Sequence, residues 1–175
     1  MVTGASSGIG AATARQLAAQ GFEVVCAARR ADRVQALADE IGGRALACDI
    51  TTDDGVAALV EAAGPRLDVL VNNAGGALGQ EPVAEADVDA WQRMYQVNVI
   101  GTEKVTRGLL PALVAARGAI VFVTSVAADG PYEGGAGYCG AKAAERMIAG
   151  ALRLEFWDQP VRITEISPGM VHTEE

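Results

Sequence analysis

Hydrophobic residues follow two periodicities along this chain of 175 residues. Apolar runs of strand length recur after a short start at Met1 and Val2, and they occupy residues 22–28, 44–50, 67–75, 119–125 and 161–167. These runs are continuous rather than alternating with polar residues, which is typical of strands covered on both faces.

The segments between the runs repeat their apolar residues at helical spacing. They span residues 9–20, 32–41, 53–63, 87–116 and 138–157, and Gly21 follows the first of them as a C-terminal cap. Strands that alternate with helices predict an α/β fold, in which right-handed crossovers place helices on both faces of a doubly wound parallel sheet. Because no linker and no internal repeat interrupts the pattern, we expect one domain over residues 1–175.

The composition of the chain excludes several classes of binding partner. Acidic residues outnumber basic ones by 22 to 14, which gives a formal charge of −8. Such a surface repels phosphate backbones, so we expect no nucleic-acid partner and no anionic membrane. The apolar runs are too short to span a bilayer and no leader pattern opens the chain, which favours a cytoplasmic protein. The three cysteines lack metal-ligand spacing, so we expect reduced thiols and no metal site.

Candidate chemistry gathers where strands end, because ligands of such folds bind at the carboxyl ends of the strands. "TGASSGIG" leads from the first strand into a helix. Gly4 permits a tight turn, Gly8 leaves room for a pyrophosphate, and Gly10 lets the helix pack on the strand. The free N–H groups and the dipole of the helix suit an anion there.

Two arginines end the second predicted strand, where folds that use NAD place an acidic residue. Arg29 and Arg30 precede a helix, whose dipole disfavours cations unless an anion is close. A 2′-phosphate accepts bidentate hydrogen bonds from a guanidinium. We therefore predict NADP as the cofactor, with Arg29 as the main contact, against the alternative of two solvated charges. Asp49, after the third strand, either accepts a hydrogen bond from an adenine or caps a helix, and the sequence favours neither.

Three later motifs complete the candidate site. "NNAG" can fasten the end of the fourth strand while exposing backbone beneath a flat ligand, and Ser125 closes the fifth strand. In "GAGYCGAK", Tyr138 and Lys142 lie one helical turn apart on one face. We expect the small residues around them to leave room for a nicotinamide ribose and a substrate. Asn98 interrupts an apolar helical stretch.

Taken together, these motifs resemble the single-domain short-chain dehydrogenases/reductases over residues 2–175. "NNAGGALGQEP" and "RITEISPGMVHTEE" are similar to the NADP-dependent 3-hydroxy acid (serine-type) dehydrogenases of that family. The resemblance implies a Rossmann-like fold and a catalytic tetrad of Asn98, Ser125, Tyr138 and Lys142, with Asn98 positioning a water. It also implies cofactor contacts from Gly4, Ser6, Gly8, Ile9 and Gly10 at the pyrophosphate, from Asn72, Ala74 and Gly75 at the adenine-side ribose and centre, and from Pro168, Gly169, Val171 and Thr173 at the nicotinamide. We add Ser7, Asp49 and Ile50 as further candidate cofactor contacts.

The pairing of a phenol with an ammonium suits the removal of a hydroxyl proton as a hydride leaves the alcohol carbon. A lysine roughly 4 Å from the phenol contributes about 4 kcal/mol at an effective dielectric near 20. That corresponds to about three pKa units, so we expect the pKa of Tyr138 to lie near neutrality. Ser125 would hold the substrate oxygen.

The resemblance implies a small-molecule substrate and a homodimer or homotetramer. Members of the family continue through a substrate-covering loop and a last strand, so the chain looks truncated before that strand. Two alternatives remain: a 3-ketoacyl reductase for carrier-bound or CoA substrates, and a non-catalytic NADP-binding sensor.

Overall fold

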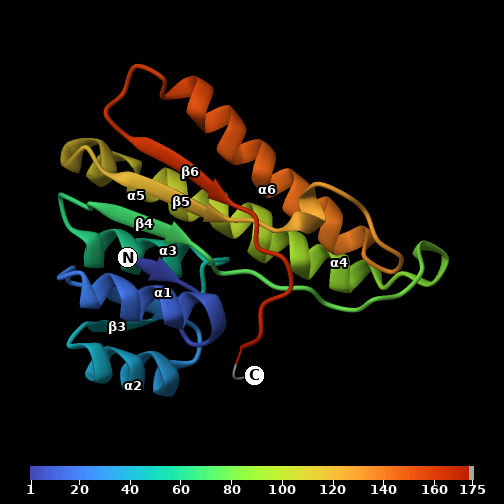
Figure 1. Ribbon diagram of the computed structural model, residues 1–175, viewed down its shortest axis with the longest axis horizontal. Helices are drawn as coiled ribbons and strands as arrows, with labels where there is room; N and C mark the ends of the chain where they lie inside the picture. The colour runs from blue at the N-terminus through green and yellow to red at the C-terminus, as the bar shows by residue number, and fades with distance from the viewer. Residues whose placement is uncertain (174–175) are drawn as a thin grey trace.

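Six parallel strands form one sheet in the computed structural model, which describes residues 1–173 (Figure 1). The sheet order is β3-β2-β1-β4-β5-β6, so the chain builds outward from β1 in one direction and then in the other. β1 is the pivot, since Val2 pairs with Cys26 on one side and with Val71 on the other. The strands are β1 (Val2–Thr3), β2 (Val25–Ala28), β3 (Arg44–Ala47), β4 (Val69–Asn72), β5 (Ala119–Val123) and β6 (Arg162–Ile166).

Helices connect the strands and cover both faces of the sheet, which confirms the predicted doubly wound, Rossmann-like fold. α1 and α2 lie beside the first strands, and α6 runs along β5 and β6 (Figure 1). The helices are α1 (Gly8–Ala19), α2 (Ala31–Ile41), α3 (Asp53–Ala63), α4 (Val88–Tyr95), α5 (Thr102–Ala116) and α6 (Ala136–Glu155), with short helical turns η1 (Val83–Glu85), η2 (Gln96–Gly101) and η3 (Val126–Ala128). Among residues 1–173, no helix combines the length and hydrophobicity that crossing a bilayer requires.

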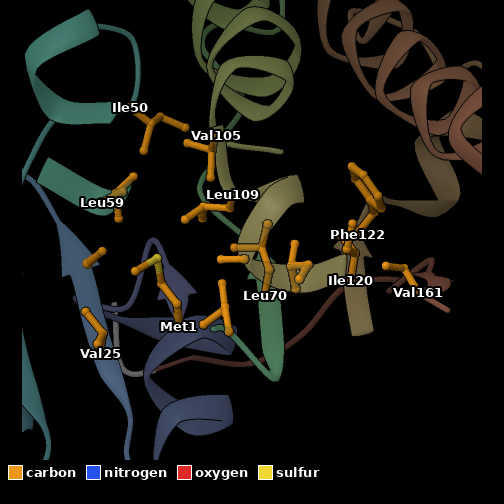
Figure 2. Close-up of a cluster of buried hydrophobic side chains, with 14 of the residues drawn as sticks. Met1, Val25, Ile50, Leu59, Leu70, Val105, Leu109, Ile120, Phe122 and Val161 are labelled. Atoms are coloured by element: carbon orange, nitrogen blue, oxygen red, sulfur yellow. The ribbon is translucent and has the colours of Figure 1, made fainter. Parts of the chain in front are cut away.

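Each face of the sheet has its own hydrophobic core. On one face, α3, α5 and α6 pack on the strands, and Figure 2 shows Leu59, Leu109 and Phe122 spread along this core. On the other face, α1 and α2 pack through residues such as Ala14 and Val34. Burial of these side chains stabilises the sheet that presents the strand ends.

The expectation of strands covered on both faces holds for the inner strands but not for the outermost two. β2, β4 and β5 are largely buried, whereas every side chain of β3 and β6 is at least partly exposed. Arg162, Thr164 and Ile166 form an exposed row on β6. Successive side chains of a strand point to opposite faces of the sheet, and α6 packs on β6, so the alternation indicates that the face of β6 that carries this row is not covered in the described structure.

The long helix predicted over residues 87–116 is three elements. α4 ends at Tyr95, and a π-helix, η2, separates it from α5. Asn98 lies in this π-helix, and its side-chain Nδ2 donates to the Met94 carbonyl at 2.8 Å. This side-chain bond competes for a carbonyl that the regular helix ladder would otherwise use, and such competition favours a local widening of the helix.

Candidate active site

A cleft of about 630 Å³ runs along the carboxyl ends of the central strands. Its walls come from the turn after β1, the ends of β2 to β5, the start of α6 and the segment after β6, which crosses the strand ends towards α1 (Figure 1). Most of the residues predicted to hold the cofactor line it: Gly4, Ser6, Ser7, Ile9, Arg29, Arg30, Asp49, Ile50, Ala74, Gly75, Tyr138, Lys142, Gly169, Val171 and Thr173.

Other predicted residues lie outside this lining. Gly8 lies at the first turn of α1, where a Cβ would be 3.3 Å from the Thr173 side chain, and Gly10 is buried against the Gly4 carbonyl. The Pro168 carbonyl accepts a hydrogen bond from the Val126 amide at 3.1 Å. Sequence reasoning also missed several lining residues: Ala28, Cys48, Asn73, Gly76, Val97, Val123 and Thr124.

The turn after β1 is shaped for a close approach to the cleft. Gly4 has a φ of +64°, and a Cβ there would lie 2.8 Å from the Ala74 Cα, so a larger residue would be strained and would clash. Ser7 is the N-cap of α1, yet its side chain makes no capping hydrogen bond to the helix. The N-terminal end of the α1 dipole therefore meets the cleft without a side-chain cap, an arrangement that favours an anion.

The two asparagines of "NNAG" fasten the strand ends, but they face different ways. The Asn72 side chain is buried and donates to Thr106 Oγ1 on α5 at 2.8 Å. Asn73 lines the cleft, and its Nδ2 donates to the carbonyls of Thr3 and Gly4 at 3.0 and 3.2 Å. The cleft floor is thus bound to the glycine turn through Asn73 rather than Asn72.

Arg30 joins the glycine turn to the end of β2. Its Nη2 donates to Ser6 Oγ at 2.8 Å and to Ser7 Oγ at 2.6 Å. Arg29 lines the cleft beside it, close enough to Asp49 for its charge to lower the pKa of that carboxyl. Two arginines therefore line the same cleft.

Asp49 is not the cap of α3, so one of the two alternatives for it is wrong. The α3 N-cap is Thr52, whose hydroxyl accepts from the Gly55 amide at 3.0 Å. Asp49 Oδ1 instead accepts from the Thr51 amide at 2.9 Å and from its hydroxyl at 2.8 Å. The Thr51 hydrogen bonds, together with the charge of Arg29, lower the pKa of Asp49 against the opposing effect of burial.

Asn98 is fully buried, and its side chain forms hydrogen bonds with the loop after β4. Its Oδ1 accepts from the Gly76 amide at 3.1 Å, and its Nδ2 donates to the Gly76 carbonyl at 3.0 Å. The same Oδ1 lies directly under Gly75, where a Cβ would collide with it. Asn98 thereby fixes the course of the backbone that lines the cleft beside Lys142.

The pKa of Tyr138 is raised above its ordinary value, which is opposite to the predicted shift towards neutrality. Burial disfavours the phenolate, and the charge of Glu145 adds to the effect, whereas a hydrogen bond from Ser125 opposes it. The Ser125 hydroxyl also accepts from the Ala127 amide at 3.1 Å. Lys142 Nζ lies 6.0 Å from the centroid of the Tyr138 ring.

Lys142 has a buried partner that sequence reasoning missed. Its Nζ donates to Glu145 Oε2 at 2.7 Å and to the Val123 carbonyl at 3.0 Å. Because Glu145 is only 1% exposed, its charge offsets that of Lys142 at short range and weakens the field of the ammonium at Tyr138. The sequence contained a signal for this pair, because Lys142 and Glu145 are three residues apart and residues at that spacing share a helix face.

The glycines of "GAGYCGAK" receive protein side chains, which corrects the expectation that they leave room for ligands. A Cβ on Gly137 would lie 2.7 Å from Met94 Cε and Trp91 Nε1, and one on Gly140 would lie 2.8 Å from the Tyr95 hydroxyl. The small residues therefore let α4 and α6 approach closely.

The cleft, its glycine turn and its Tyr-Lys pair coincide with a family match over the whole chain. The family model for short chain dehydrogenase matches residues 1–175. The chain belongs to this short-chain dehydrogenase family. It is therefore an oxidoreductase of a family that uses nicotinamide cofactors.

Similar proteins within the family share most of the chain. An uncharacterized oxidoreductase of Mycobacterium tuberculosis is 58% identical over 175 residues, which cover 99% of this short-chain dehydrogenase and 69% of the relative. Serine 3-dehydrogenase of Agrobacterium fabrum is 43% identical over 181 residues, covering 99% and 72% of the two chains. The solved closed form of serine dehydrogenase complexed with NADP⁺ superimposes with a TM-score of 0.93 at 37% identity and covers 99% of this chain and 73% of that one. The resemblance to serine-type dehydrogenases is thus confirmed.

The residues present fit a nicotinamide dinucleotide. A Cβ on Gly4 would fill the turn against Ala74, α1 has no side-chain cap, and Arg29, Arg30 and Lys142 are among the residues that line the cleft. Each feature matches one part of an anionic, extended ligand.

Proposed function

We propose that this short-chain dehydrogenase is NADP-dependent and interconverts a small 3-hydroxy acid and its ketone, with Tyr138 as general acid and base. The observation that carries the proposal is that Tyr138 and Lys142 line the same cleft as the glycine turn and the two arginines. The similarity to serine 3-dehydrogenase, whose substrate is a 3-hydroxy acid, supports the substrate class.

The arginines support NADP over NAD. Arg29 and Arg30 would bind the 2′-phosphate, and Ser6, held by Arg30 at 2.8 Å, would lie beside it. A guanidinium pair recognises a phosphate through charge and bidentate geometry. The relative solved with NADP⁺ is consistent with this assignment.

The remaining lining residues would hold the rest of the dinucleotide. Asp49 and Ile50 would meet the adenine, the backbone of Asn73 to Gly75 would lie under the centre, and Gly169, Val171 and Thr173 would cover the nicotinamide end. When bound, NADP⁺ would accept the hydride from the alcohol carbon.

Proton transfer falls to residues of the chain. In ketone reduction, Tyr138 donates its proton to the carbonyl oxygen, and the raised pKa keeps that proton available. In oxidation, Tyr138 must first become phenolate, which requires added positive charge in the cleft. Ser125 would hold the reacting oxygen, and Asn98 would act by fixing Gly75 and Gly76.

Replacing Tyr138 with Phe tests the catalytic role. We expect turnover of NADP⁺ with a panel of 3-hydroxy acids to fall by about 10²-fold or more, the usual contribution of a positioned acid-base group, while NADP binding stays within about twofold. Tyr95→Phe, on α4 outside the cleft lining, is the matched control. Full activity of Tyr138→Phe would refute the role. A strong preference for reducing a 3-ketoacyl thioester with NADPH would replace 3-hydroxy acids as the proposed substrate class.

Replacing Arg29 with Asp tests the cofactor. The variant should lose about tenfold or more in the ratio of NAD to NADP dissociation constants, because one charge-assisted contact is worth about 1.5–3 kcal/mol. Arg107→Asp makes the same charge change on the exposed side of α5 and should leave the ratio unchanged. An unchanged ratio in Arg29→Asp would contradict the assignment.

We also propose a cytoplasmic homo-oligomer, a dimer or a tetramer. Met147, Leu154 and Trp157 expose apolar side chains along and just beyond α6, which supports contact with a second copy. Light scattering of the purified protein should give a multiple of the protomer mass, and a monomer at micromolar concentration would contradict the proposal.

A further inference from the structure

Glu145 is a buried carboxylate beside the candidate catalytic pair. It lies on α6, three residues after Lys142 and seven after Tyr138, and it is 1% exposed. A buried acid is costly unless it is paired, and its partner here is the Lys142 ammonium at 2.7 Å. None of the roles assigned above uses this carboxylate.

The pairing sets how Lys142 can serve the cleft. An ammonium has three N–H groups, and two of them are engaged by Glu145 and by the Val123 carbonyl. The third remains for a ligand, at a point where a Cβ on Gly75 would be 3.3 Å from Nζ. Glu145 therefore fixes the direction of Lys142 as well as compensating its charge.

We propose that Glu145 is a positioning residue for proton transfer, which holds Lys142 towards the cleft and whose negative charge adds to burial in keeping the proton on Tyr138. The inference rests on the proposed acid-base role of Tyr138. It assigns to one carboxylate both the orientation of the cation and a part of the preference of the phenol for its neutral form.

Other charges around Glu145 explain why its own ionisation is finely balanced. The charge of Glu165 on β6 repels that of Glu145, although Arg146 Nε binds Glu165 at 3.2 Å and Arg146 Nη1 also pairs with Asp129. Burial is the main reason why the pKa of Glu145 is raised to about 7. The charge of Lys142 and its hydrogen bond oppose this shift, and the charge of Glu165 adds to it. Near neutral pH the carboxyl can therefore take up a proton, and the field of Lys142 then reaches Tyr138 without an opposing anion.

The consequence is a pH dependence for each direction of the reaction. Ionised Glu145 favours neutral Tyr138, the form that protonates a ketone. Neutralising Glu145 by substitution lowers the pKa of Tyr138, so oxidation of the alcohol should reach its plateau at a lower pH.

The decisive experiment follows Tyr138 without any cofactor or substrate. The sequence has three tyrosines, so the protein labelled with ¹³C at the tyrosine ζ carbon gives three resonances, and Tyr138→Phe identifies the one from Tyr138. Glu145→Gln keeps a hydrogen-bond acceptor for Lys142 but removes the charge. We expect the Tyr138 titration to move down by about one pH unit, the size of a nearby charge effect in a partly screened site.

A matched control and a second variant keep the test decisive. Glu155→Gln removes the same charge from an exposed position on α6 and should leave the Tyr138 titration in place. Glu145→Met, neutral and of similar length, should reproduce the downward shift, which covers the case in which Glu145→Gln does not fold. A folded Glu145 variant in which Tyr138 titrates as in the wild type overturns the proposal.

Activity provides the second measurement. The pH profile of NADP⁺ reduction by Glu145→Gln should have its rising limb displaced to lower pH by the same amount as the resonance. If the wild type turns over no 3-hydroxy acid, the proposed function fails, while the resonance still decides the role of Glu145. A profile that keeps the wild-type limb although the resonance has moved refutes the link to proton transfer.

Discussion

Gly137 lies one residue before Tyr138, where α6 crosses α4. A Cβ at this position would lie 2.7 Å from the Cε of Met94 and from the Nε1 of Trp91. Ordinary carbon contacts lie about 3.5–4.0 Å apart, so both neighbours would have to retreat by close to an ångström. The methionine terminus can move, but Met94 is almost fully buried and the indole is rigid.

The substitution Gly137→Ala therefore sets two effects against each other. Alanine gains up to about 1 kcal/mol of helix propensity over glycine. Overpacking a filled contact costs about 1–3 kcal/mol. Because the clash involves two side chains, we expect the free energy of unfolding to fall by about 1–2 kcal/mol, which corresponds to about 2–8 °C in Tm for a chain of this size.

Gly150 supplies the matched control on the same helix. A Cβ there meets nothing within 4 Å, so Gly150→Ala should keep the gain in propensity and stabilise the protein by about 0.5–1 kcal/mol. Urea unfolding followed by circular dichroism measures both variants. If Gly137→Ala proves as stable as Gly150→Ala, the close α4–α6 packing described here is wrong.

Two further predictions concern buried polar groups. Thr3→Val removes the hydroxyl that accepts from the amides of Asn73 and Ala74 at 3.0 and 3.1 Å, and stranding both should lower the free energy of unfolding by about 2–4 kcal/mol. Thr13→Val, at a partly exposed position of α1, should change it little in the same urea titration. Burial raises the pKa of Glu145 from 4.5 to about 7, so between these pH values the folded protein holds a proton that the unfolded chain has released. Stability must then fall as the pH rises through this window, and Glu145→Gln should lack that slope; equal slopes in urea titrations of both proteins would contradict the shift.

The order of the elements was readable from the sequence because hydrophobic periodicity dominates in this fold. The strands, the glycine turn and the crossovers follow from continuous apolar runs and from Gly21 and similar stops. The π-helix at residues 96–101 was not readable, since it depends on the Asn98 side chain finding both Met94 and Gly76. Those contacts exist only once α4 and the loop after β4 are in place.

Which of Asn72 and Asn73 reaches the cleft is a second feature that the sequence could not predict. Successive side chains of a strand point to opposite faces, so the residue at which β4 ends decides which asparagine reaches the cleft. β4 ends at Asn72, whose side chain reaches Thr106 on α5, and the chain then turns so that Asn73 binds the glycine turn. The motif alone identifies the strand end but not its face.

Electrostatics is where sequence reasoning and structure diverge most, and one helix explains why. Tyr138, Lys142 and Glu145 are spaced by four and three residues, so α6 places the phenol, the ammonium and the carboxylate on one face. A pairwise estimate for the first two gives a lowered pKa, whereas burial and the third group reverse the direction. Lys142 interacts both with the buried Glu145 and with the cleft, so the effect of substituting Lys142 depends on whether Glu145 is present, and the reverse. The contributions of the two residues to acid-base chemistry are therefore not additive. The proposed acid-base unit of this short-chain dehydrogenase is therefore the face of α6 as a whole, with Tyr138 and Lys142 at the end that lines the cleft.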